Sequence, residues 1–142
     1  MPIQIIEANS THSEPITRLL TQMGYPDSVK AVAQRIKENQ RTDYKIFVAE
    51  INQLIAGVIV THTYTYLHAT GLVGRIMTFC VDENIRGTGV GTQLLTYAEN
   101  YLASLKCVKV ELNCNNRRTE THQFYRQRGY EQTSLHFVKK LT

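Results

Sequence analysis

The chain has 142 residues, of which 42% are hydrophobic and 20% are charged, and its formal net charge is +4. This length and composition are typical of one globular domain that buries a core without disulfides or a structural metal, so we expect a single domain over residues 1–142. The chain has no apolar run of about 18 residues, and residues 1–10 lack the pattern of a signal peptide. We therefore expect a cytoplasmic protein without a membrane partner.

Hydrophobic periodicity and turn residues predict helices and strands along the whole chain. In chain order, the expected elements are a strand at 3–7, a helix through 16–23, a helix through 29–36, strands at 45–51, 54–66 and 72–81, a helix at 89–105, a strand at 107–113, a helix from the loop at 114–117 to 128, and strands at 130–133 and 135–141.

The order β-α-α-β-β-β-α-β-α-β-β predicts an α/β (α+β) fold with a single mixed, mostly antiparallel sheet flanked by helices. The strand–helix–strand unit at 72–81, 89–105 and 107–113 predicts one parallel pair with a right-handed crossover. Asn52 and Gln53 read as a tight hairpin turn between two of the antiparallel strands.

Basic residues concentrate toward the C-terminus. Residues 101–142 hold eight bases and three acids, a net charge of +5, whereas residues 1–100 hold eight bases and nine acids. This asymmetry predicts an anionic partner for the C-terminal part. A nucleic acid would account for it, but the chain has no nucleic-acid recognition motif, so we expect no nucleic-acid partner.

The three cysteines, Cys80, Cys107 and Cys114, are an odd number without C-x-x-C spacing. This pattern favours reduced thiols over a disulfide framework and gives no support for a metal site. We therefore expect no bound metal.

A glycine-rich turn at residues 86–91, RGTGVG, joins a predicted strand to a predicted helix. Unpaired backbone N–H groups at a helix N-terminus favour an anion, and glycines let a phosphate approach the backbone closely. The turn lacks the Lys of a phosphate-binding Walker loop and the third glycine of a dinucleotide fingerprint. A strand–helix connection without a ligand is the alternative.

Two blocks of the sequence resemble the GCN5-related N-acetyltransferase (GNAT) family. Residues 81–91, VDENIRGTGVG, resemble the acetyl-CoA-binding motif of that family, and residues 118–130, RTETHQFYRQRGY, resemble its later block. Residues 136–141, HFVKKL, are similar to its last strand. Arg118 stands where the family frequently has an Asn, and Asn116 lies nearby.

The resemblance implies a GNAT-like acyl-CoA acyltransferase fold and an acetyl-CoA-dependent N-acetyltransferase of the EC 2.3.1 class. The acetyl group would pass from the thioester to a primary amine of a small molecule or peptide by direct attack. Acetyl-CoA is the implied co-substrate, with no metal. The residues implied in cofactor binding, at the pantetheine strand, the pyrophosphate turn and one later position, are Phe79, Cys80, Val81, Arg86, Gly87, Thr88, Gly89, Val90, Gly91 and Asn116.

Tyr125 matches the family's catalytic Tyr, which implies that it donates a proton to the leaving thiolate; an aromatic residue packed in the core is the alternative reading. Glu111 is the leading candidate for the general base, because its side chain alternates out of phase with Val108 and Val110, although a solvated strand carboxylate would show the same pattern. Asp82 and Glu120 are weaker candidates for the base, and Glu120 would also favour a helix N-terminus.

His62, Tyr64 and Tyr66 alternate along one predicted strand and would share one of its faces. They could bind the acceptor, or form a half-exposed hairpin tip. Aminoglycosides, polyamines, amino acids and protein amines all remain open as acceptors. A non-catalytic acyl-CoA-binding module is the alternative function. Members of the family often dimerise, which leaves a homodimer open, and the sequence does not indicate which base would meet the 3′-phosphate of CoA.

Overall fold

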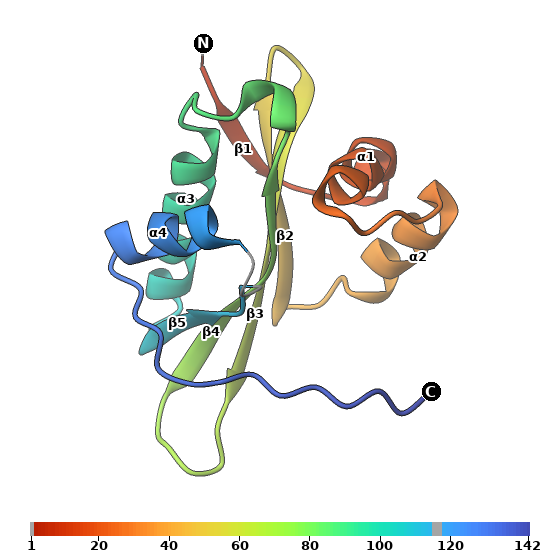
Figure 1. Cartoon of the computed structure of the whole chain (residues 1–142). Helices are drawn as coiled ribbons and strands as arrows, with labels where there is room; N and C mark the ends of the chain where they lie inside the picture. Colours follow the sequence, from red (N-terminus) through yellow and green to blue (C-terminus); the bar gives the residue numbers. More distant parts are fainter. Residues whose placement is uncertain (1, 115–117) are drawn as a thin grey trace. The chain divides into compact units, whose positions relative to one another are not determined.

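Figure 1 shows the computed structural model of the chain, which describes residues 2–114 and 118–142. In chain order, the elements are β1 (Gln4–Glu7), η1 (Ser10–His12), α1 (Ser13–Met23), α2 (Val29–Glu38), β2 (Tyr44–Ile51), β3 (Leu54–Thr65), β4 (Leu72–Val81), η2 (Glu83–Ile85), α3 (Val90–Ser104), β5 (Lys109–Leu112) and α4 (Thr119–Gln127). They fall into two compact units, Met1–Glu111 and Leu112–Thr142. No helix among the described residues is long and apolar enough to span a membrane.

The sheet has the strand order β1-β2-β3-β4-β5. The first four strands pair antiparallel. The Val108 N–H donates to the Leu72 carbonyl at the start of β4 (2.8 Å), and Glu111 lies 3.5 Å from Arg75. Because the residue numbers rise together along both strands, β5 runs parallel to β4. The expected mixed, mostly antiparallel sheet is therefore confirmed.

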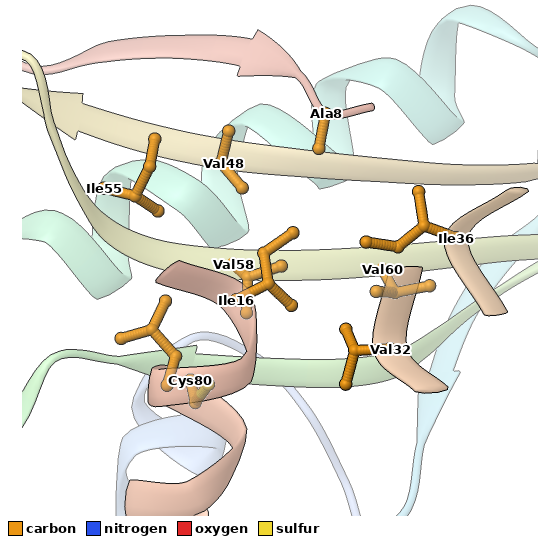
Figure 2. Close-up of a cluster of buried hydrophobic side chains, with 10 residues drawn as sticks. Ala8, Ile16, Val32, Ile36, Val48, Ile55, Val58, Val60 and Cys80 are labelled. Carbon is orange, nitrogen blue, oxygen red and sulfur yellow. The ribbon is translucent and has the colours of Figure 1, made fainter. Parts of the chain in front are cut away.

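Helices α1 and α2 cover one face of the sheet (Figure 1). Helix α1 ends at Gly24, whose φ of 101° is a left-handed conformation that glycine adopts without a steric penalty. The Ser28 side chain caps the N-terminus of α2 by accepting a hydrogen bond from the Ala31 N–H. The buried side chains between the helices and the strands, most of them labelled in Figure 2, are Ala8, Ile16, Leu19, Val32, Ile36, Val48, Ile55, Val58, Val60 and Cys80. Burial of each larger aliphatic side chain contributes about 1.5–3 kcal/mol, so this layer holds α1 and α2 in place.

Helix α3 covers the opposite face of the sheet and approaches the strands closely (Figure 1). A Cβ atom added at Gly57 would lie 2.7 Å from Leu94, and one added at Gly74 would lie 2.7 Å from Leu102. Both leucines are fully buried. Glycine at these two strand positions therefore sets how near α3 lies to the sheet.

Several local predictions are confirmed. The predicted strand at 72–81 coincides with β4, and the predicted strand at 54–66 exceeds β3 by one residue. Asn52 and Gln53 have φ angles of 50° and 66°, as a two-residue hairpin turn requires. A register shift between β3 and β4 places Val60 opposite Thr78 and Thr61 opposite Ile76, so Met77 forms a β-bulge.

The two predicted strands at 130–133 and 135–141 are wrong. Residues 130–142 form no helix or strand, and Leu135, Phe137 and Leu141 are 74–89% exposed. Their alternating apolar pattern favours an extended backbone, but a strand also needs a ladder partner. Residues 131–142 pair with no strand among the described residues, so the predicted order loses its last two elements.

Candidate active site

The glycine turn lies where the sequence predicts it, between the end of β4 and the first residue of α3. Gly87 and Gly89 have φ angles of 82° and 92°, and Gly89 is the N-cap of α3. Neither an acidic residue in the first turn nor a side-chain cap from Gly89 occupies the helix N-terminus. The first amides of α3 can therefore donate to a phosphate, and the helix dipole favours its negative charge.

A cluster of polar side chains ties this turn to α1. Arg18 Nη1 lies 2.5 Å from Asp82 Oδ2, Gln22 Nε2 donates to Asp82 Oδ1 (3.4 Å), and the Glu83 N–H donates to Gln22 Oε1 (3.0 Å). Arg18 Nη2 also donates to the Ile55 carbonyl (3.0 Å). We call these residues, Arg18, Gln22 and Asp82, the α1 clamp. The clamp fixes the point at which the chain leaves β4 for the turn.

The clamp also helps to lower the pKa of Asp82. The Asn84 N–H, Arg18 and Gln22 all stabilise its carboxylate, and together they hold the pKa of Asp82 below its usual value despite the opposing effect of burial. A carboxylate with a lowered pKa is a weak proton acceptor. Asp82 therefore fits a structural role better than that of the general base.

The residues predicted to meet pantetheine, Phe79, Cys80 and Val81, form the last part of β4 and pair on one side with β3. On the other side, β5 has only four residues, and its contacts with β4 fall near Leu72 and Arg75. β4 thus continues well past the point where β5 ends. The bulge at Met77 lies immediately before this part of the strand.

Glu111 lies in a network of charged and polar groups. The Tyr66 hydroxyl lies 2.7 and 2.8 Å from the two carboxylate oxygens of Glu111, to which it can donate, and Arg75 and Lys109 lie at 3.5 and 3.9 Å. The Glu111 side chain is 25% exposed, and burial raises its pKa. A raised pKa makes the carboxylate a stronger base near neutral pH.

His62 and Tyr64 share one face of β3, and Tyr66 follows directly after its last residue; the three rings contact one another in sequence. The ring centroids of His62 and Tyr64 are 5.5 Å apart, and those of Tyr64 and Tyr66 are 5.6 Å apart. Tyr44 on β2 extends this row, with its ring 6.2 Å from that of His62. The structure thus joins the predicted acceptor residues to Glu111 through Tyr66.

Tyr125 lies on α4 in the second unit. Its ring contacts those of Phe124 (5.5 Å) and Tyr130 (5.6 Å), and the Tyr130 N–H donates to the Tyr125 carbonyl. Burial, aided by the nearby Cys114, raises the pKa of Tyr125 to about 12. Its phenol therefore keeps its proton at neutral pH and can act as a donor. Asn116 lies outside the described residues.

Sequence reasoning missed Arg18, Gln22 and Arg75. Arg18 is 64 residues from Asp82 in the chain, and Arg75 is 36 residues from Glu111. No local pattern marks such pairs, because each partner is an ordinary polar residue on its own element. Only the order of the strands brings the partners together.

The chain is similar in sequence to known acetyltransferases. The profile of the Acetyltransferase (GNAT) family matches residues 13–130. The aminoalkylphosphonate N-acetyltransferase of Salmonella typhimurium is 33% identical over 90 residues, which make up 63% of this chain but only 58% of that protein.

Two solved structures share the fold over nearly the whole chain. A GNAT family acetyltransferase of Staphylococcus aureus superposes with a TM-score of 0.85 at 23% identity, covering 99% of this chain and 100% of that one. The aminoglycoside N-acetyltransferase AAC(6′)-Iy, solved in complex with CoA, gives a TM-score of 0.86 at 19% identity, covering 99% and 96%. With the family profile matched over 118 residues, the chain belongs to the GNAT family of acetyltransferases.

Proposed function

We propose that this protein is an acetyl-CoA-dependent N-acetyltransferase that acts on a small primary amine. The observation that carries the proposal is the turn at Gly87 and Gly89, which presents the N-terminus of α3 without a side-chain cap after β4 and η2. A pyrophosphate fits this site because glycine amides and the helix dipole both favour a close anion. The backbone from Arg86 to Gly91 would hold the pyrophosphate, and Phe79 to Val81 would hold pantetheine.

The reaction needs three proton transfers. The acceptor ammonium gives a proton to a base, and its neutral nitrogen forms a bond to the acetyl carbon. The carbon–sulfur bond then breaks, the nitrogen loses its second proton, and the departing thiolate takes a proton. Deprotonating an amine with a pKa of about 10.4 at neutral pH costs about 4–5 kcal/mol, so a base in the site accelerates the reaction.

We assign the base role to Glu111 and the donor role to Tyr125. Burial raises the pKa of Glu111, which increases its proton affinity. The pKa of Tyr125, about 12, keeps the phenol protonated. The same physical effect, desolvation, raises the proton affinity of both groups, so the donor role of Tyr125 rests on its match to the family motif and not on its raised pKa.

An aminoalkylphosphonate is the proposed acceptor class, supported by the name of the relative that shares 33% identity, aminoalkylphosphonate N-acetyltransferase. We place His62 and Tyr64 beside the acceptor, and Tyr66 as the residue that orients Glu111, because its hydroxyl is within hydrogen-bond distance of that carboxylate. Thiol release from acetyl-CoA, measured with aminoalkylphosphonates, aminoglycosides, polyamines and amino acids, tests the activity. Stabilisation by CoA without turnover of any amine would instead support an acyl-CoA-binding module.

The cofactor site is tested with two matched glycine variants. Gly89→Ala and Gly24→Ala each place a Cβ at a left-handed φ, of 92° and 101°, in open space. Each costs about 1–2 kcal/mol in stability. Only Gly89→Ala should also weaken CoA binding, measured by calorimetry; equal CoA affinity in the two variants would contradict the assignment of the turn.

The donor role is tested with Tyr125→Phe. Loss of a general acid lowers kcat by about 100-fold or more, whereas the KM for acetyl-CoA should change little. Tyr130→Phe, which alters the ring next to Tyr125, is the control and should keep kcat. Wild-type turnover by Tyr125→Phe would remove Tyr125 from the mechanism.

A further inference from the structure

A cavity of about 120 Å³ lies between α1, α2 and the sheet face that they cover. Seven aliphatic side chains line it, and Figure 2 labels five of them, Ile16, Val32, Ile36, Val58 and Val60. The polar residues of the lining are Arg35, Asn39, Tyr44 and Thr78. A concave apolar site with a few polar groups is the usual form of a small-molecule site.

The cavity reaches the strand that carries the proposed cofactor site. Thr78 lies on β4 directly before Phe79, the first residue of the proposed pantetheine segment, and directly after the bulge at Met77. Thr78 also pairs with Val60 of β3, so both side chains face the cavity. A molecule in the cavity therefore lies beside the part of β4 where the thioester would end.

The cavity also borders the row of aromatic residues on the same face. Tyr44, part of its lining, pairs with His62 across β2 and β3, and their rings are 6.2 Å apart. His62 pairs in turn with Arg75, a partner of Glu111. The apolar cavity and the proposed base thus lie on one face of one sheet.

The charge of the lining restricts what the cavity can take. Among the described residues that line it, Arg35 is the only charged one, and no carboxylate is present. Asp27 binds Nη1 of Arg35 (2.9 Å), but a guanidinium has five N–H donors and can pair with a second anion. A lining of this kind disfavours a polycation and favours an anion at Arg35.

We propose that this cavity holds the body of the acceptor, a primary amine on a short aliphatic chain with an anionic group at its far end. A cavity of about 150 Å³ binds benzene, so this one accommodates roughly five carbon atoms. The anionic group pairs with Arg35, and the amine lies toward Thr78. The inference rests on the proposed acetyl transfer and narrows its substrate class, because it excludes aminoglycosides and polyamines.

The apolar lining has a chemical consequence for the amine. Removal from water disfavours the ammonium form relative to the neutral amine. The proton that the reaction must remove is therefore held less tightly in the cavity than in solution. The cavity would thus lower the cost of deprotonation as well as select the acceptor by size.

The size of the site is tested by filling the cavity. Val32→Met adds volume at the lining, whereas Val48→Met adds the same volume within the same buried cluster but outside the lining. Val32→Met should raise the KM for aminopropylphosphonate by about tenfold or more, with Tm and the KM for acetyl-CoA little changed. Val48→Met should lower Tm without this change in KM. An unchanged acceptor KM in Val32→Met would make the cavity a packing defect and overturn the proposal.

The charge of the site is tested at Arg35. Arg35→Gln should lower kcat/KM for aminopropylphosphonate by about tenfold or more relative to butylamine, and Arg35→Lys should restore part of it. Asp27→Asn breaks the same ion pair but keeps the guanidinium, so it should leave this ratio at or above the wild-type value. Equal effects of Arg35→Gln on the anionic and the neutral amine would overturn the role of Arg35.

Calorimetry separates this inference from the proposed function. Aminopropylphosphonate is titrated into the CoA complex of the wild-type protein, Val32→Met and Arg35→Gln. Binding that both variants weaken supports the cavity even where acetyl transfer fails, in which case only the proposed activity is wrong. Absent binding, or binding that neither variant changes, overturns the cavity assignment even where other amines are acetylated.

Discussion

The two faces of the sheet differ in how closely helices approach the strands. On the α3 face, Gly57 and Gly74 leave no room for a Cβ, and Leu94 and Leu102 fill the space above them. On the α1–α2 face, the strands carry Val58 and Val60, and a cavity of about 120 Å³ remains between strands and helices. The α3 face is therefore closely packed, whereas the α1–α2 face, which we call the looser face, has room for a ligand.

This difference suits the two tasks that the sheet would perform. The close packing of α3 fixes the position of its N-terminus, where the proposed pyrophosphate site begins, and rigid placement lowers the cost of binding. The looser face places an apolar cavity and a row of polar aromatic side chains beside β4. Fixed cofactor contacts and adjustable acceptor contacts thus fall on opposite sides of one sheet.

Gly57→Ala, which disturbs the close packing of the α3 face, is expected to have the largest effect on stability and CoA binding. The new Cβ would lie 2.7 Å from Leu94 and 3.2 Å from the Cys80 carbonyl, which is backbone and cannot rotate away. Overpacking of this kind costs about 1–3 kcal/mol, so the midpoint of urea unfolding should fall and CoA should bind less tightly.

The control for this prediction is the double variant Gly57→Ala with Leu94→Val. The smaller side chain at position 94 removes the nearest clash, so it should recover part of the lost CoA affinity. A Gly57→Ala variant as stable as the wild type would mean that α3 can move off the sheet at no cost. That result would contradict the claim that the α3 face is more closely packed than the α1–α2 face.

Arg18→Gln breaks the α1 clamp, which joins helix α1 on the looser face to the glycine turn. It is expected to have a smaller effect on stability and on the KM for acetyl-CoA. The ion pair with Asp82 is partly exposed, with Arg18 45% exposed, so its loss costs about 1 kcal/mol or less in unfolding free energy. Because the clamp positions the turn, the KM for acetyl-CoA should rise several-fold while kcat holds.

The pH dependence of stability checks the clamp independently. The pKa of Asp82 is lowered in the folded protein, so its contribution is present above the pKa of the unfolded chain and is lost as pH falls through the folded value. The stability difference between wild type and Arg18→Gln should therefore vanish in acid. Arg41→Gln, which breaks the exposed ion pair with Asp43 on another loop, should leave the KM for acetyl-CoA unchanged.

The sequence predicts best what local chemistry decides. The turn at Asn52 and Gln53 and the break at Gly24 follow from backbone preferences of a few neighbouring residues, and both lie where expected. The glycine turn is predictable for the same reason, since Gly87 and Gly89 have positive φ angles. Each of these features needs only a short segment of chain.

Features that depend on distant partners are less predictable. The alternation at 135–141 favours a strand, but a strand also requires a neighbour, and no described strand pairs with it. The partners of Glu111 were missed for the related reason that Tyr66, directly after β3, and Arg75, on β4, reach it from other parts of the chain. The cavity has no sequence signal either, because its lining combines core residues of helices and strands.

The smallest expected effect is that of Tyr66→Phe, which keeps the aromatic row and removes one hydroxyl next to Glu111. That hydroxyl lies 2.7–2.8 Å from the carboxylate oxygens, and a donor at this distance stabilises the ionised form. Without it, the pKa of Glu111 should rise above its already raised value. The acid limb of the kcat/KM profile should move to higher pH, while the rate at the pH optimum changes little. Tyr64→Phe makes the same change one ring along and should leave the limb in place. A limb that stays fixed in Tyr66→Phe would separate Glu111 from proton removal, and the looser face would then serve only to bind the acceptor.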